Sequence, residues 1–192
     1  IQTNAQFIAI GGEAGFDVRN AFYPRDNSFA YGRGGTYGIK TSSTFITSFN
    51  SSLVVGIGGV DDANMEPSPF LDTDYLLNNP FVPEDLPKGA PDEKGLMPYK
   101  EGTYGICTIG GSYIESENSS KMYAYGGEYG AYAGSFFEIT DTSLMELHGG
   151  RIGGQSNGYF TFVYSNNIFK AYGSEIGVSA GTSLSFSTGN NN

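Results

Sequence analysis

A glycine element that returns every 23 to 25 residues constrains this chain more than any other feature. It begins as Gly12-Glu13-Ala14-Gly15 and returns with the same Gly-x-x-Gly spacing at four later places, together with two weakened copies. The seven elements start at Gly12, Gly35, Gly59, Gly102, Gly127, Gly150 and Ser174. The intervals are 23, 24, 43, 25, 23 and 24 residues, so only one departs from the period. A fixed period of this length indicates stacked structural repeats.

Each period holds three short stretches with the pattern of β-strands. In the first, directly after the glycines, apolar residues such as Tyr104 and Ile106 alternate with small or charged ones, which is the period of a strand. The second is predicted to stack an interior column of Phe22, Phe45, Tyr113, Phe137, Phe160 and Leu184, and beside it a column of Ile114, Ile139, Phe162 and Phe186. In the third, we expect inward-facing pairs at Met122 and Ala124, Met145 and Leu147, and Phe169 and Ala171.

A turn separates the second and third stretches at a fixed phase. Its members are Asn27-Ser28, Asn50-Ser51, Asn118-Ser119, Asp141-Thr142 and Asn166-Asn167. Asparagine tolerates the left-handed backbone that a sharp corner needs. Helical repeats require about 33 to 47 residues per period, and a closed β-sandwich would not repeat the same residue types at one phase. The sequence therefore predicts an all-β protein, a single β-solenoid domain over residues 1–192 with about seven coils.

With three strands per coil, interior apolar stacks and an asparagine corner, the chain resembles the right-handed parallel β-helix superfamily. The corner residues that carry this resemblance are Asn27, Asn50, Asn118 and Asn166. The superfamily includes pectate-lyase-like enzymes, phage tailspikes and autotransporter passengers. The resemblance covers nearly the whole chain and is specific for architecture, but a fold of this kind implies no single function.

The one long interval contains a proline-rich, acidic insertion at about residues 66–95. Seven of the eight prolines lie between Gly59 and Gly102. Because Leu96 and Met97 match the phase of Met122, we expect the insertion to leave its coil near the asparagine corner. Packing on the solenoid, binding to a neighbouring subunit and calcium binding all stay open, although no EF-hand spacing is present. The apolar anchors of a partner-binding arm would be Phe70, Leu71, Tyr75, Leu76, Leu77, Phe81 and Val82.

Charged residues at one phase of the repeat form the candidate chemical site. Glu128, Arg151 and Glu175 are predicted to be stacked neighbours about 4.8 Å apart, as adjacent strands are. Paired carboxylates can act as acid and base in polysaccharide cleavage, whereas the alternative is a salt-bridge ladder on a solvated face. His148 is the only histidine and is expected on an outer face, and Cys107 occupies an ordinary strand position. We expect no cofactor and no metal.

Net charge limits the possible partners. The chain carries a formal charge of -10, and such a surface repels nucleic acid phosphates. No apolar run reaches the roughly 18 residues that a membrane helix needs. We therefore expect neither nucleic acid binding nor membrane insertion.

The two ends of the chain meet the repeat at the same phase. Asn4 and Asn190 both fall at the asparagine corner, and no capping element is visible. The flanking apolar residues are Phe7, Ile8, Ile10, Leu184 and Phe186. Open solenoid ends expose unpaired strand edges, and head-to-tail contacts between them propagate into filaments. A fragment of a longer solenoid is the competing explanation.

The sequence thus predicts a non-enzymatic structural protein that stacks on itself into a filament or appendage. We expect it to be extracellular or at the cell surface, or alternatively part of a virion. The alternative function is a carbohydrate-binding or polysaccharide-cleaving β-helix, or an adhesin, that uses the face with Glu128, Arg151 and Glu175.

Overall fold

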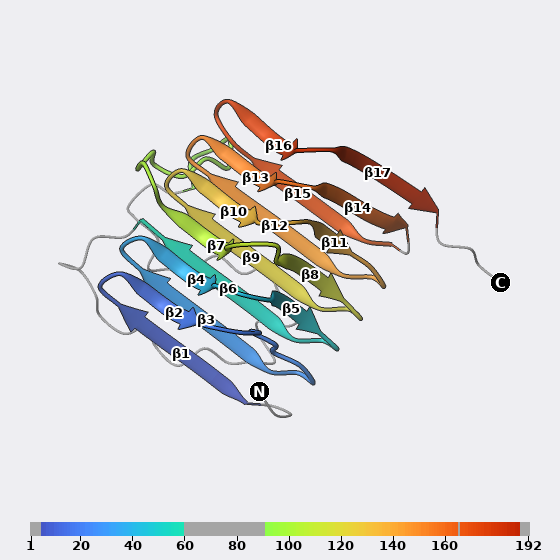
Figure 1. The fold of residues 1–192 in the computed structure, drawn as a ribbon, viewed down its shortest axis with the longest axis horizontal. Coiled ribbons are helices and arrows are strands. Elements are labelled where there is room, and N and C mark those ends of the chain that lie inside the picture. The colour runs from blue at the N-terminus through green and yellow to red at the C-terminus, as the bar shows by residue number, and fades with distance from the viewer. Residues whose placement is uncertain (1–4, 60–90, 165, 189–192) are drawn as a thin grey trace.

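A parallel β-solenoid forms the whole described part of the chain. The computed structural model describes residues 5–59, 91–164 and 166–188. Each coil contributes one strand to each of three parallel sheets, here called sheets A, B and C. Figure 1 shows the coils stacked in chain order, with the sheet B and sheet C strands of a coil following one another along one side and the sheet A strand returning along the other.

Within each sheet, neighbouring strands come from successive coils. Sheet A holds β1 (Gln6–Gly11), β3 (Phe29–Gly34), β6 (Leu53–Gly58), β9 (Lys121–Gly126), β12 (Leu144–Gly149) and β15 (Ile168–Tyr172). Sheet B holds β2 (Ala14–Val18), β4 (Tyr37–Thr41), β7 (Tyr104–Thr108), β10 (Tyr129–Ala133), β13 (Ile152–Ser156) and β16 (Ile176–Ala180). Sheet C holds β5 (Phe45–Phe49), β8 (Tyr113–Glu117), β11 (Phe137–Ile139), β14 (Tyr159–Tyr164) and β17 (Ser183–Thr188).

The structure confirms the predicted all-β solenoid. It has about six coils, whereas the number of glycine elements predicted about seven. The first coil has no sheet C strand of its own, but Phe22 forms a parallel bridge to Ile46 and extends that sheet by one position. The architecture agrees with the parallel β-helix resemblance. No helix long and apolar enough to span a membrane occurs among the described residues.

The insertion explains the difference in coil number. Gly59 and Gly102 belong to one and the same glycine corner, because β6 ends at Gly58 and β7 of that same coil begins at Tyr104. The long interval is therefore an insertion into the glycine corner, and the prediction that it leaves near the asparagine corner is wrong. Met97 does not enter the interior column of Met122; it packs against the outer face of sheet A.

Interior columns run along the solenoid, but three of their predicted members lie elsewhere: Phe45, Tyr113 and Ile114. Register pairs Phe22 with Ile46, Phe45 with Tyr113, and Ile114 with Phe137. The interior column of sheet C is therefore Phe22, Ile46, Ile114, Phe137, Phe160 and Leu184. Phe45 and Tyr113 instead stack on the outer face, and Ser116 takes the place predicted for Ile114 in the second column.

The glycine corner is where sheets A and B approach most closely. A Cβ atom added to Gly105 would lie 2.6 Å from the Gly130 carbonyl oxygen and closer still to the Tyr125 amide nitrogen. The equivalent glycines of the other coils face the backbone of sheet A in the same way: Gly15, Gly38, Gly130 and Gly153. The repeated glycines therefore make a thin edge at which two backbones pack directly.

The opposite corner uses left-handed residues, as predicted, with a corrected phase. Two consecutive residues have positive φ in each of four coils: Asp26-Asn27, Asn50-Ser51, Asn118-Ser119 and Asp141-Thr142. Asn27 and Asn166 therefore occupy the second corner position, whereas Asn50 and Asn118 occupy the first. Neighbouring coils are tied side chain to side chain here, since the Asn50 amide donates to Asp26 over 2.6 Å.

Candidate functional site

The first coil forms one edge of the described solenoid. Among the described strands, β1 pairs only with β3 and β2 only with β4. Phe7 is 39% exposed and Ile8 is 41% exposed, and the interior residues Phe16 and Val18 are only partly buried. Asn4, which the sequence placed at this end, lies outside the described residues. An apolar interior and a sheet edge that has no further described strand beside it thus face outward together.

The last coil is open in the same way. Within the described part of the chain, β15, β16 and β17 each pair with a single strand. Leu184 and Phe186, the last members of two interior columns, are 49% and 61% exposed. Ile168 and Ile176 are also exposed on this coil. Asn190 lies outside the described residues.

The registers of the two ends are complementary. Five interior positions of the last coil have a counterpart in the first, because their columns can be followed from coil to coil through the strand pairings. A seventh coil in the same register would bring together Phe169 with Phe7, Ala171 with Ala9, Val178 with Phe16, Ala180 with Val18 and Leu184 with Phe22. In all five pairs, both side chains are apolar.

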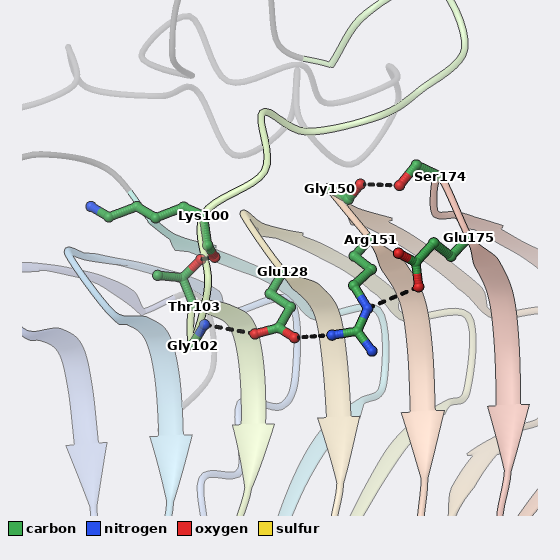
Figure 2. Close-up of polar contacts among 8 residues, drawn as sticks. All are labelled: Lys100, Gly102, Thr103, Glu128, Gly150, Arg151, Ser174 and Glu175. Carbon is green, nitrogen blue, oxygen red and sulfur yellow. Dashed lines mark hydrogen bonds and ion pairs between the residues drawn. The ribbon is translucent and has the colours of Figure 1, made fainter.

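The three charged residues singled out in the sequence do lie side by side at the glycine corner. Figure 2 shows Arg151 between two carboxylates, with its Nη1 2.6 Å from Oε1 of Glu128 and its Nε 3.0 Å from Oε2 of Glu175. Glu128 is buried and its other oxygen accepts the backbone N–H of Gly102 over 2.6 Å. Both carboxylates are thus held by fixed donors, which is the geometry of a salt-bridge ladder.

An open hollow of about 430 Å³ adjoins this ladder. Its described lining residues are Tyr99, Arg151, Ser174 and Glu175. Tyr99 is exposed, and the Ser174 hydroxyl donates to the Gly150 carbonyl oxygen over 2.7 Å. The hollow therefore offers an aromatic ring beside charged groups, but neither carboxylate is free of the Arg151 guanidinium.

Aromatic side chains also form a column on the outer face of sheet C. Phe45, Tyr113, Phe136 and Tyr159 stack ring on ring, with centroids 5.2, 4.6 and 4.8 Å apart. Rings stacked in this way cover one another's faces and present mainly their edges. A sugar ring that packs on an aromatic face would find little room in the middle of the column.

Beside this column lies a group of carboxylates that the sequence reasoning missed. Register stacks Glu115 directly on Glu138, with Glu117 on the same strand as Glu115. Burial, together with the nearby Glu117 and Glu138 carboxylates, raises the pKa of Glu115 to about 7. The Thr47 hydroxyl donates to Glu115 over 3.3 Å. These residues were not singled out from the sequence; the alternation Glu-x-Glu at 115–117 is the one signal that could have found them, and only the structure reveals their partial burial.

We expect Glu115→Gln to stabilise the protein at high pH only. The fold favours the protonated carboxyl, so the penalty is fully present above about pH 7 and disappears as the pH falls toward the unfolded pKa of about 4.3. The gain in the free energy of unfolding should be about 1 kcal/mol at pH 8, because solvent screens a partly exposed group. Urea denaturation at several pH values measures it, with the exposed Glu101→Gln as control. An equal gain at pH 4.5 would contradict the assignment.

His148 lies on the outer face of sheet A, as expected. Its ring stacks between Tyr125 and Tyr172, with both centroid distances 4.8 Å. Nδ1 lies 2.7 Å from the Gly95 carbonyl oxygen and Nε2 lies 3.0 Å from Oε1 of Glu146. The hydrogen bond with His148 lowers the pKa of Glu146. His148 therefore joins the chain after the insertion to the solenoid.

Cys107 and the inserted arm are the remaining features that the sequence singled out as possible functional sites. Cys107 is a buried free cysteine, and burial raises its pKa to about 12, so its thiol is not activated as a nucleophile. The arm residues Phe70, Leu71, Tyr75, Leu76, Leu77, Phe81 and Val82 lie outside the described residues. Within the described ranges, no group of three or more histidine, cysteine or acidic residues is placed to hold a metal ion.

We compared the chain with protein families, curated proteins and solved structures. Neither a family model, nor a curated protein, nor a solved structure matches this chain.

Proposed function

We propose that this chain is a structural β-solenoid protomer that stacks head to tail into a filament. The observation that supports the proposal is that the strands of the first and last described coils are sheet edges among the described residues, and that the interior columns of these two coils match in register. Unpaired strand edges are templates for pairing with another chain, and an interface between two different ends repeats without closing. Each junction would add two strand pairings, β15 with β1 and β16 with β2, and would bring β17 beside Phe22, the bridge position of the first coil.

Apolar burial supplies the main attraction at such a junction. Phe186, Leu184 and Phe7 leave water together, and full burial of side chains of this size contributes about 1.5–3 kcal/mol each. Part of this is offset by the loss of translational and rotational freedom on association. The remaining balance favours assembly at protein concentrations that are reached locally on a surface.

Electrostatic repulsion opposes assembly. Each copy carries a net charge of -10. In the continued register, Glu175 of one copy comes beside Glu13 of the next, since both follow the glycine element at the same phase. Because salt screens such repulsion over a Debye length of about 10 Å at 0.1 M, assembly should strengthen as salt is added.

Electron microscopy and sedimentation of the purified chain test the proposal. We expect filaments of constant width whose sedimenting fraction rises between about 0.02 and 0.5 M sodium chloride. A monomer that stays stable and insensitive to salt over this range, at concentrations up to about 100 μM, would rule the proposal out. Glu13→Arg should lower the salt requirement, because it places a cation beside Glu175.

Location outside the cell is part of the proposal. It is supported by the architectural resemblance to secreted and virion-borne β-helices, and we place the filament at a cell surface or on an appendage. The role is mechanical, so no catalytic residue is assigned.

A second candidate function is carbohydrate binding at the hollow beside the ladder. It is favoured by the exposed ring of Tyr99 close to Arg151 and Glu175. A panel of acidic and neutral glycans, read by binding and by new reducing ends, tests it. Binding that is lost in Tyr99→Ala but kept in Tyr159→Ala would support this site. No binding and no cleavage across the panel would remove it.

A further inference from the structure

Three tyrosines, here called the tyrosine stack, lie ring on ring outside the solenoid core at the beginning of their sheet B strands. Tyr37, Tyr104 and Tyr129 are paired in register on the neighbouring strands β4, β7 and β10 (Figure 1). The ring centroids of Tyr37 and Tyr104 lie 5.4 Å apart with an interplanar angle of 12°. Those of Tyr104 and Tyr129 lie 4.9 Å apart with an angle of 3°. These distances are close to the spacing of adjacent strands, so the register of the solenoid holds the three phenols face to face.

Two other stacked aromatic columns lie on the described strands, but neither places two phenols in succession. On sheet C, Phe136 lies between Tyr113 and Tyr159. On sheet A, His148 lies between two tyrosines in the same way. Tyr132 contacts two rings of the tyrosine stack edge-on, with interplanar angles of 71° and 73°. Phenols stacked directly on one another thus set the tyrosine stack apart from these two columns.

The position of the tyrosine stack favours oxidation of its phenols. All three rings are partly exposed, so a dissolved oxidant can reach them. Burial, with Cys107 and the two flanking tyrosines nearby, raises the pKa of Tyr104 to about 12. Burial also raises the pKa values of Tyr37 and Tyr129. The phenols are therefore protonated at neutral pH, and each loses a proton together with an electron when it is oxidised.

We propose that Tyr37, Tyr104 and Tyr129 form an oxidative crosslinking site, where a one-electron oxidant joins Tyr104 to one of its two neighbours as a dityrosine. Two equivalents of the oxidant each take one electron from a phenol, and the two hydroxyl protons pass to water. The two phenoxyl radicals then form a carbon–carbon bond between ring carbons next to the hydroxyl groups. Each of these carbons loses its hydrogen as a proton while the neighbouring oxygen regains one, which restores two aromatic phenols. The proposal does not depend on filament formation.

Stacking in register is what makes this coupling favourable. Two radicals on separate molecules must first meet, whereas neighbours held face to face by the backbone are already together, and such proximity strongly raises the rate of a reaction. The new bond would also join neighbouring coils covalently. A bond between Tyr37 and Tyr104 encloses the whole insertion in a covalent loop, and crosslinks that close long loops restrict the unfolded chain most. The crosslinked protein should therefore unfold at a higher urea concentration than the untreated protein.

Oxidation of the dilute wild-type protein is the first test, with photogenerated tris(bipyridine)ruthenium(III) as the one-electron oxidant and persulfate as the electron acceptor. We expect a monomer that has lost the mass of two hydrogen atoms and shows biphenol fluorescence. Proteolysis and mass spectrometry should find Tyr104 joined to Tyr37 or Tyr129. The yield per molecule should not change on dilution of about 100-fold, because the reaction is intramolecular. Biphenol formed only between molecules, or only between pairs that leave Tyr104 out, would overturn the proposal.

A matched pair of variants is the second test. Tyr104→Phe should lower the yield of intramolecular biphenol about tenfold or more, because the two remaining phenols are then separated by two strand spacings, roughly 9.6 Å. Tyr113→Phe removes a phenol that stacks on Phe45 and Phe136, and it should leave the yield unchanged. Both variants keep an aromatic ring in the column, and circular dichroism checks that each is folded. An undiminished yield in Tyr104→Phe, or equal losses in both variants, would contradict the assignment.

Phe136→Tyr is the complementary gain of function. The Phe136 ring stacks between Tyr113 and Tyr159 with centroid distances of 4.6 and 4.8 Å. The variant therefore places three phenols in succession on sheet C, and residue 136 should become joined to Tyr113 or Tyr159 under the same oxidation. If the sheet C column stays uncrosslinked in this variant, stacking in register does not direct the coupling and the proposal fails.

Discussion

Replacing Gly105 with alanine should destabilise the solenoid by about 4 kcal/mol or more. The new methyl group would lie between two backbones, near the Tyr125 amide and the Gly130 carbonyl, and neither can move as a side chain does. The overlap must be relieved by separating sheets A and B at the glycine corner, where hydrogen bonds with the coils on both sides hold the strands. Losses of this size arise only from a few mechanisms, and overpacking against rigid neighbours is one of them.

Gly111→Ala provides the control in the same coil. A Cβ atom there meets no atom within 4 Å, and its φ is not in the left-handed region. It should be neutral or stabilising by up to about 1 kcal/mol, because alanine restricts the unfolded chain. Urea denaturation followed by circular dichroism measures both variants, with the slope compared because repeat proteins can unfold in parts. Equal midpoints for the two variants would mean that the glycine repeat has no packing role.

The repeat and the fold class were predictable because one position of the glycine corner, from Gly15 in the first coil to Gly177 in the last, holds glycine in every coil. A constraint that recurs in every coil leaves a period that is visible without any structure. The asparagine corner was visible for a similar reason, since two left-handed residues in succession favour asparagine and aspartate. Which of the two corner positions each asparagine occupies was not predictable, because both positions accept the same residue types.

The interior register failed where two apolar residues are adjacent. Phe45-Ile46, Tyr113-Ile114 and Phe136-Phe137 each allow either residue to face inward, and a shift by one residue reverses the faces. Aromatic residues were read as core, yet the column of Phe45 and Tyr113 is stabilised by stacking on the outside. Periodicity alone cannot separate a buried column from a stacked surface column.

The sequence also contained a signal for the buried outer face of sheet A, which the sequence analysis did not use. Strand β6, with Leu53, Val54 and Val55 in succession, is a continuous apolar run, which is typical of strands buried on both faces. The Glu128, Arg151 and Glu175 ladder was predictable because stacking follows directly from the period. The raised pKa of Glu115 was not, because it depends on how much water neighbouring side chains exclude.

Phe186→Asp should abolish head-to-tail assembly without unfolding the protomer. Phe186 is already more exposed than buried in the single chain, so the change removes little from the folded monomer. At the proposed junction, however, the next copy would cover the new carboxylate beside the apolar column of Leu184 and Phe22, and burying a charge there costs several kcal/mol. A cost of about 3 kcal/mol raises the concentration needed for assembly by about 100-fold. Sedimentation across a concentration series measures this shift.

Ser185→Asp is the matched control, and mixing experiments reveal the polarity of the junction. Ser185 is the neighbour of Phe186 on the same strand but points to the outer face, so its replacement adds the same charge outside the column. It should assemble nearly as the wild type does. Because Phe186→Asp keeps an intact first coil, it should add to the open last coil of a wild-type filament and then block further growth there. Small amounts should therefore shorten wild-type filaments, whereas unchanged lengths would argue against head-to-tail stacking through these two ends.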